Sequence, residues 1–204
     1  FNEMLLAYQN QTVQLHSLVK MRVVLEDGRS SIVESTVGRF IFNENMPQDL
    51  GFVDRNENKQ AILKAMLQTI VHRGPDSEGT YIDEDAALGF RRLSIIDLAD
   101  GSQPLYNEDR SLVLLFNGEI YNYQGLREEL IADGHVFTTH TDSEVLIHGY
   151  EKYGEQLLDK LRGMFAFCIW DVKKKKLFIA RDFFGIKPMY YAKMGDTFLF
   201  GSET

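Results

Sequence analysis

The sequence predicts an α+β fold in which β-sheets pack face to face and helices flank them. Residues 164–170 carry an apolar side chain at every position, so this strand is apolar on both faces. Such a strand needs cover on both sides, which a sheet with one solvent-exposed face does not give. Residues 57–70 and 143–161 instead carry apolar residues at helical spacing. A chain of 204 residues with 44% hydrophobic and 25% charged residues has the size and composition of one globular domain, with or without an appendage.

The first 55 residues differ in pattern from the rest and predict a small β-hairpin appendage. Residues 18–25 alternate between apolar and polar side chains, and residues 31–42 are rich in β-branched residues, as in two strands. Asp27–Gly28 between them is a turn signal. No catalytic residue types cluster here. We therefore expect residues 1–55 to form a scaffold or binding segment that precedes a domain of residues 56–204.

Both helices and strands are predicted after residue 56. The helix that begins near Glu57 is expected to end at Gly74–Pro75, because Pro cannot continue a helix. Residues 143–161 predict a helical pair, and Thr141 with Glu144 has the spacing of a capping box at its start. The remaining strand signals fall on residues 86–90, 112–116, 164–170, 177–180 and 197–200.

Charge and cysteine content narrow the classes of function. A net charge of -8 disfavours nucleic acid as a partner, because phosphate binding usually leaves a basic surface. The basic run Lys173–Lys176 lies between two predicted strands and is interpreted as a solvated hairpin turn. The single cysteine, Cys168, excludes an internal disulfide and favours a cytoplasmic location. No apolar run reaches the length of a transmembrane helix, so we expect no membrane as a partner.

An ordered set of short motifs follows residue 71. These motifs are His72–Asp76, Arg91–Asp97, Gln103–Asn107, Asn117–Asn122, Thr141–Glu144, Ala180–Asp182 and Gly185–Pro188. Together they resemble the class II glutamine amidotransferase (glutaminase) domain of asparagine synthetase (glutamine-hydrolysing), over residues 51–204. The resemblance implies an αββα sandwich of the N-terminal-nucleophile hydrolase type. It also implies a reaction in which the thiol of an N-terminal Cys releases ammonia from the side-chain amide of glutamine through a thioester.

The same resemblance assigns a site for L-glutamine. Asn117 and the backbone N–H of Gly118 match the oxyanion hole, where donors aimed at a developing negative charge stabilise the tetrahedral intermediate. Arg92 matches the residue that binds the α-carboxylate, since a planar guanidinium can make two parallel hydrogen bonds to it. Asp142 matches the acceptor for the α-amino group, and Glu119 belongs to the same binding set.

The nucleophile of that family is missing from its expected place. The family begins with Cys, and the resemblance places this position on Pro47, which has neither a thiol nor a primary amine. Cys168 belongs to a predicted interior strand, where a thiol acts as a small hydrophobic group. We therefore expect an N-terminally truncated glutaminase domain that lacks the opening strand of its sheet, is inactive and binds glutamine weakly.

No cofactor or metal is expected for the chain itself. The synthetase half of the family carries a Ser-Gly-Gly-x-Asp-Ser loop for ATP, and the sequence has no such run, so ATP and magnesium would belong to a missing synthetase domain, an expected partner. Several histidines show no metal-ligand spacing and are expected in turn or surface positions: His72, His135, His140 and His148. Four aromatic residues are expected in the core: Phe183, Phe184, Tyr190 and Tyr191.

Residues 1–55 carry a second resemblance. Met4–Tyr8, Val19–Val23 and Thr36–Glu44 resemble the bacterial RNA polymerase β′ subunit, without the aspartate motif that holds the catalytic magnesium of that enzyme. The chain starts with Phe1 rather than Met, and these features together indicate a fragment or an apparent chimera. The alternative function is therefore a non-catalytic module that binds RNA polymerase subunits, or a chimeric gene product with no selected function.

Overall fold

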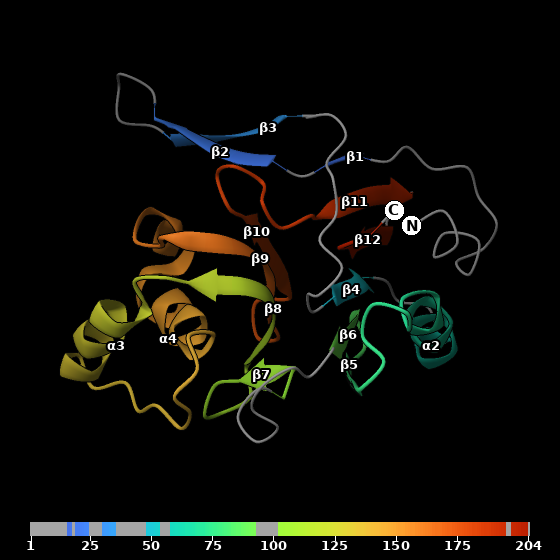
Figure 1. Ribbon diagram of the computed structural model, residues 1–204, viewed down its shortest axis with the longest axis horizontal. Coiled ribbons are helices and arrows are strands. Elements are labelled where there is room, and N and C mark those ends of the chain that lie inside the picture. Colours follow the sequence, from blue (N-terminus) through green and yellow to red (C-terminus); the bar gives the residue numbers. More distant parts are fainter. Residues whose placement is uncertain are drawn as a thin grey trace.

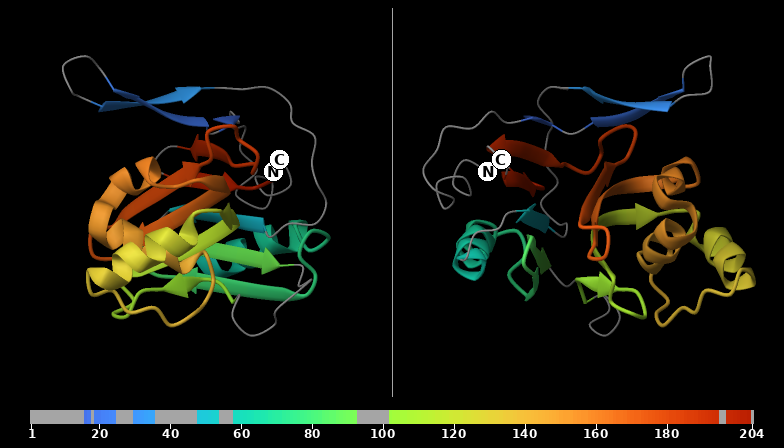
Figure 2. Two further views of the ribbon diagram at one scale, coloured as in Figure 1. Left: turned by 60° about the vertical axis from the view of Figure 1, so that its left-hand side comes forward. Right: turned by 180° about the vertical axis from the view of Figure 1, so that it is seen from behind.

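The computed structural model shows four layers of secondary structure, two sheets between two layers of helices (Figure 1). The described residues are 58–92, 102–194 and 197–203, together with the strands that lie between residues 16 and 53. Helices α3 (Tyr123–Ala132) and α4 (Glu144–Tyr153) cover one sheet, and α2 (Lys59–Thr69) covers the other. Figure 2 shows the two sheets stacked on each other. The predicted αββα arrangement is confirmed.

The sheet beneath α2 is antiparallel and has the strand order β1-β11-β12-β4-β6-β5 among the described residues. Its strands are β1 (His16–Ser17), β4 (Gln48–Val53), β5 (Ser77–Ile82), β6 (Ala86–Arg92), β11 (Tyr190–Met194) and β12 (Thr197–Gly201). In β4, Gly51 lies opposite Leu88 of β6 and Phe200 of β12. The expectation that the sheet lacks its opening strand is therefore wrong, because β4 pairs on both sides at that place.

The sheet beneath α3 and α4 is also antiparallel, in the order β10-β9-β8-β7. Its strands are β7 (Leu105–Tyr106), β8 (Leu112–Ile120), β9 (Gly163–Asp171) and β10 (Lys176–Arg181). The predicted strands over residues 112–116, 164–170 and 177–180 are confirmed, and each extends further than its apolar core. The predicted helical pair is α4 followed by the 3-10 helix η1 (Gly154–Asp159).

The predicted N-terminal hairpin is present as β2 (Val19–Val24) and β3 (Ser30–Ser35), which pair antiparallel (Figure 1). Strand β3 confirms the first part of the second predicted strand, and the rest of that prediction lies outside the described residues. Residues 36–47 lie outside the described part of the chain. The boundary at residue 55 between two domains stays a prediction.

A dry interface separates the two sheets. Leu88 and Phe90 of β6 pack against Leu115 of β8 and against Cys168 and Trp170 of β9. Cys168 is fully buried, opposite Leu115 in the neighbouring strand. The prediction that this thiol is a core group is confirmed.

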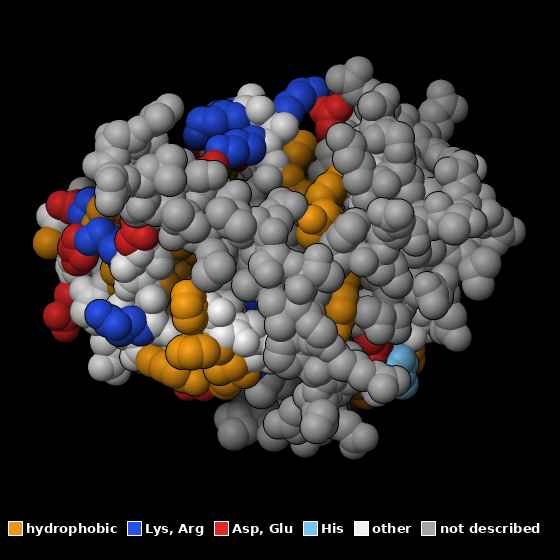
Figure 3. All heavy atoms as spheres, turned by 90° about the horizontal axis from the view of Figure 1, so that it is seen from above, with side chains coloured by type: hydrophobic (Ala, Val, Ile, Leu, Met, Phe, Trp, Pro, Cys, Tyr) orange, Lys and Arg blue, Asp and Glu red, His pale blue; other side chains and the backbone are white. Residues whose placement is uncertain are grey.

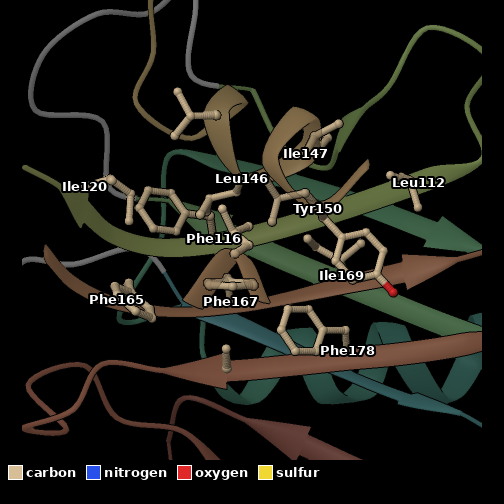
Figure 4. Close-up of a cluster of buried hydrophobic side chains, with 14 of the residues drawn as sticks. Leu112, Phe116, Ile120, Leu146, Ile147, Tyr150, Phe165, Phe167, Ile169 and Phe178 are labelled. Atoms are coloured by element: carbon tan, nitrogen blue, oxygen red, sulfur yellow. The ribbon is translucent and has the colours of Figure 1, made fainter. Parts of the chain in front are cut away.

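The opposite face of the β8–β9 sheet is equally apolar and lies under α4 (Figure 4). Phe116, Phe167 and Ile169 point from the strands toward Leu146 and Tyr150 of the helix. Strand β9 is thus buried on both sides, as its uniformly apolar sequence requires. Fully burying one such side chain contributes about 1.5–3 kcal/mol.

The predicted capping box at the start of α4 is wrong. Ser143 is the N-cap residue and makes no side-chain capping hydrogen bond, so Glu144 begins the helix instead of lying at its third position. The carboxylate of Glu144 accepts hydrogen bonds from the backbone N–H and the hydroxyl of both Thr138 and Thr139. Thr141 bonds to the hydroxyls of Thr139 and Ser143. Glu144 therefore closes the loop before the helix.

Two of the four aromatic residues expected in the core are on the surface. Phe183 and Phe184 are 68% and 77% exposed, whereas Tyr190 and Tyr191 pack against the hydrophobic clusters of the sheet. The Phe side chains belong to the loop after β10 and contact each other edge to face. The prediction rested on their apolar character alone, and it is wrong because these residues lie in a loop and not on the buried face of a strand.

The interpretation of Lys173–Lys176 as a solvated hairpin turn is confirmed, since it joins β9 to β10. Each lysine forms an ion pair: Lys173 with Asp109, Lys174 with Asp171, Lys175 with Asp85 and Lys176 with Glu155. On the face shown in Figure 3, Lys and Arg side chains likewise lie beside Asp and Glu side chains.

Asp83, in the turn between β5 and β6, joins the two sheets. Its Oδ2 accepts hydrogen bonds of 2.7 Å from the hydroxyl of Tyr81 and from Nε1 of Trp170 in the other sheet. Its Oδ1 accepts the backbone N–H groups of Asp85 and Ala86 at 2.8 and 2.7 Å. Burial raises the pKa of this carboxyl, but the hydrogen bonds outweigh burial, and the pKa lies below its ordinary value.

Replacing Asp83 by Asn should lower the free energy of unfolding by about 2 kcal/mol at neutral pH, because charge-assisted hydrogen bonds are lost. The pKa of Asp83 is lower in the folded protein than in the unfolded one, so the ionised carboxylate stabilises the fold at pH values above the ordinary Asp pKa of about 3.9. This stabilisation is lost as the pH falls through the pKa of the folded protein. The difference between Asp83→Asn and wild type should therefore shrink in acid.

Urea denaturation at neutral pH and below about pH 4 measures this difference. Glu84→Gln, an exposed substitution in the same turn, is the matched control and should leave stability unchanged. An equal effect of the two substitutions would contradict the role of Asp83.

Candidate active site

The side chain of Asn117 is buried near the end of β8 and has no hydrogen-bond partner among the described residues. It is 1% exposed, and neither its Oδ1 nor its Nδ2 is bonded. Buried polar atoms in proteins are nearly always paired, and an unpaired one costs about 1–3 kcal/mol. An amide in such a position is a candidate group for binding a ligand.

Gly118 lets β8 lie close to β9 beside Asn117. Its φ is +155°, and an added Cβ would lie 2.7 Å from Cα of Phe165 and closer still to the carbonyl oxygen of Met164. No side chain fits there without moving the strands apart. The backbone at Gly118 is therefore unshielded by a side chain of its own, next to the amide of Asn117.

The end of the sandwich that holds Asn117 also holds the end of β6. Gln103 donates from Nε2 to the carbonyl of Phe116 at 2.8 Å and accepts the N–H of Phe116 at 2.7 Å. The backbone of Gln103 also lies against Gly79 of β5, where it would clash with a Cβ. Gly79 pairs with Phe90 of β6. Phe90 and Phe116 are thus level with each other. The two strands also begin on the same side, because Asp83 before β6 bonds to Trp170, the partner of Val113 near the start of β8, so β6 and β8 end on the same side.

Arg92 is the last residue of β6 and reaches this same end. Its neighbour Arg91 is directed to the other side, because its Nε donates to the carbonyl of Leu67 in α2 at 2.9 Å. Alternation along the strand places Arg92 on the inter-sheet face with Leu88 and Phe90. The structure therefore brings the predicted carboxylate-binding residue to the end of the sandwich that holds Asn117.

Asp142 and Glu119 complete the predicted set at the tip of β8. Oδ2 of Asp142 accepts the backbone N–H of Ile120 at 2.7 Å. Burial raises the pKa of the Asp142 carboxyl above its ordinary value; the hydrogen bond from Ile120 opposes this shift, and the charge of Glu119 adds to it. Glu119 itself is exposed. Two carboxylates in this position favour a cationic group between them.

Sequence reasoning did not assign a site role to the loop after β10, which is fastened beside Gly118. The backbone N–H of Asp182 donates to the carbonyl of Phe165 at 2.7 Å, and its Oδ2 accepts the N–H of Phe165 at 3.2 Å and that of Lys187 at 3.1 Å. Phe165 is the partner of Gly118 in the sheet. Burial lowers the pKa of Lys187, against the charges of Asp182 and Glu119. The sequence signal for this loop is that Ala180–Asp182 and Gly185–Pro188 belong to the ordered motifs of the family resemblance.

The nucleophile position proposed from the sequence, Pro47, lies outside the described residues. The next residue, Gln48, begins β4 and pairs with Arg91 of β6, so β4 starts at the same end of the sandwich as Asn117. Cys168 lies in the middle of β9 between the sheets and is fully buried. Its thiol is therefore separated from the site by packed side chains.

A family model described as the glutamine amidotransferase domain matches residues 46–204, more than half of the chain. The chain belongs to this family. The match includes β4, all the predicted site residues and the loop after β10. The glutamine amidotransferase prediction is thus confirmed at the level of the domain.

Curated relatives of this amidotransferase domain are asparagine synthetases. Asparagine synthetase [glutamine-hydrolyzing] 1 of Bacillus subtilis (strain 168) is 53% identical over 146 residues, which cover 72% of this chain and 23% of that protein. Asparagine synthetase [glutamine-hydrolyzing] 3 of Arabidopsis thaliana is 45% identical over 141 residues, 69% of this chain and 24% of the relative. The chain therefore spans about a quarter of the length of these relatives.

A solved structure confirms the fold. The glutamine phosphoribosylpyrophosphate amidotransferase from B. subtilis superposes with a TM-score of 0.64 at 23% identity, over 77% of this chain and 42% of that one. The amidotransferase domain described here has the predicted N-terminal-nucleophile hydrolase fold. The resemblance of residues 1–55 to RNA polymerase β′ stays a prediction, since the family match begins at residue 46. Among the described residues, no helix is long and apolar enough to span a membrane.

Gly118→Ala should lower the free energy of unfolding by about 3 kcal/mol, because its Cβ would overlap the backbone of β9. Gly125→Ala is the matched control. Its Cβ would meet nothing within 4 Å in α3, and it should raise stability by about 0.5–1 kcal/mol. Chemical denaturation of both variants measures the effects, and equal values would show that the close approach of β8 to β9 is not constraining.

Proposed function

We propose that this chain is a glutamine-binding domain of the asparagine synthetase type, with L-glutamine held at the shared end of β6 and β8. The observation that carries the proposal is the buried, unpaired amide of Asn117 next to Gly118. Such a pair supplies a side-chain N–H and a backbone N–H for one oxygen, as stabilisation of an oxyanion requires. The curated relatives, all named as glutamine-hydrolyzing, support glutamine as the ligand.

The charged groups match the two ends of the amino acid. In the proposed complex the guanidinium of Arg92 binds the α-carboxylate in a bidentate manner. The α-ammonium lies beside Asp142 and Glu119, whose charges it neutralises. A buried carboxylate with a raised pKa is costly in the free protein, and a bound cation relieves that cost. The side-chain amide then extends toward Asn117.

We further propose that the chain as given binds glutamine without hydrolysing it. The sequence contains one cysteine, Cys168, and this thiol is in the core. The nucleophile position proposed on Pro47 offers neither thiol nor primary amine. We also propose that, together with a synthetase domain that uses ATP and magnesium, the domain serves asparagine formation in the cytoplasm. An interaction with RNA polymerase subunits through residues 1–55 is retained only as the alternative.

Arg92→Gln should weaken the binding of L-glutamine about 10- to 100-fold, the range given by the loss of a charge-assisted pair of hydrogen bonds. Arg110→Gln is the matched control. Arg110 is exposed and precedes the start of β8, at the other end of the sandwich. Its Cζ lies 4.0 Å from the centroid of the Tyr106 ring.

Isothermal titration of L-glutamine into wild type and both variants measures these affinities, with release of ammonia followed in parallel. The proposal requires binding by wild type and Arg110→Gln, reduced binding by Arg92→Gln, and no ammonia from any of them. Equal affinity in all three would refute the assignment of Arg92. Thiol-dependent ammonia release would refute the inactive state while leaving the glutamine site intact.

A further inference from the structure

Two histidines and a glutamate converge on one side of α4. His135 comes from the loop after α3, whereas His148 and Glu151 lie three residues apart on one face of α4. One ligand atom from each lies within 4.8 Å of the others. The sequence-based expectation missed this cluster because the histidines are distant in sequence and meet only through the packing of the loop on the helix.

Two distances in the cluster match the spacing of neighbouring ligands of a tetrahedral ion. Oε2 of Glu151 lies 3.2 Å from Nδ1 of His148 and 3.3 Å from Nδ1 of His135. Two ligand atoms bound about 2.0–2.1 Å from one tetrahedral zinc ion lie about 3.3 Å apart. Both imidazoles thus present the same kind of nitrogen to one carboxylate oxygen, at the spacing of neighbouring ligands.

Further polar groups lie behind two of the three side chains. Nε2 of His148, on the other side of its ring, lies 3.7 Å from Oε1 of Glu144. Nδ2 of Asn107 donates to Oε1 of Glu151 at 2.8 Å, which leaves Oε2 directed at the histidines. A carboxylate behind a ligating histidine and a donor behind a ligating carboxylate are typical of metal sites.

The charge around the cluster is negative. Glu108 adds a third carboxylate to those of Glu144 and Glu151, and its Oε1 lies 3.9 Å from Nδ1 of His148. The carboxylates therefore attract positive charge to this point, which a divalent cation supplies.

A pocket gives access from solvent. It has a volume of about 490 Å³ and is lined by groups that include His135, Glu151 and Asn107. His148 is 2% exposed, whereas the side chain of His135 is 20% exposed and closes the cluster on the pocket side. The pocket provides an entry path for an ion and room for a water ligand.

We propose that His135, His148 and Glu151 bind one zinc ion, with a water molecule from the pocket as the fourth ligand. A set of two histidines and one carboxylate, with water as the fourth ligand, occurs in zinc sites of proteins. The ion would join the loop between α3 and α4 to the helix itself. The same loop leads to Asp142, so the ion would also restrain the approach to the glutamine site without entering it.

Titration of zinc sulfate into the metal-free full chain tests the proposal, with zinc content after dialysis and the visible spectrum of the cobalt-loaded chain as readouts. Wild type should retain one zinc per chain and give the intense spectrum of tetrahedral cobalt. His135→Ala should lose at least about 100-fold in zinc affinity. Glu144→Gln, which removes the carboxylate charge behind His148 and also weakens the bonds to Thr138 and Thr139, should lose about 10-fold.

His72→Ala is the matched control, because His72 is outside the cluster and lies 3.5 Å from Glu203. It should bind zinc as wild type does. His135 is partly exposed, so its replacement is expected to preserve the fold, which circular dichroism checks. Equal zinc affinity in His135→Ala and His72→Ala, or less than half a zinc per wild-type chain, would overturn the proposal.

Discussion

The burial of β8 and β9 on both faces is the constraint on which the rest of the structure depends. One face packs under α4, and the other packs against β6 across the dry interface between the sheets. Because neither face meets water, every polar atom along these strands must be paired or costs free energy. Trp170 satisfies this condition through Asp83, whereas Asn117 does not. This departure from the rule is the basis for the proposed glutamine site at the end of β8.

The same packing explains why the functional groups gather at one end. Asp83 joins the sheets in the turn before β6, and Gln103 joins β5 to β8 near their other ends. Arg92, at the end of β6, is thereby held level with Asn117 and Gly118. Asp142 is fastened to the same tip by the N–H of Ile120. The proposed binding of the two charged ends of glutamine requires this rigidity, because each contact depends on a fixed spacing.

The strand cores and the site motifs could be predicted from the sequence, since runs of apolar residues and short sequence motifs are local signals. The apolar run around Cys168 predicted a strand buried on both faces, and Asn117 with Gly118 was found as a motif. Contacts that depend on the packing of loops could not be predicted. Glu144 had the spacing of a capping group, but its carboxylate is taken up by Thr138 and Thr139. The meeting of His135 with His148 and the exposure of Phe183 also follow from loop geometry that no local pattern encodes.

Substitution of Asn117 by Leu tests the central claim most directly, with the free energy of unfolding and the glutamine affinity measured on the same protein. If the buried amide is kept for a ligand, an apolar side chain of similar size should raise the free energy of unfolding by about 1–2 kcal/mol and abolish glutamine binding. A variant that is less stable than wild type and still binds glutamine would contradict the account, because Asn117 would then be a structural group.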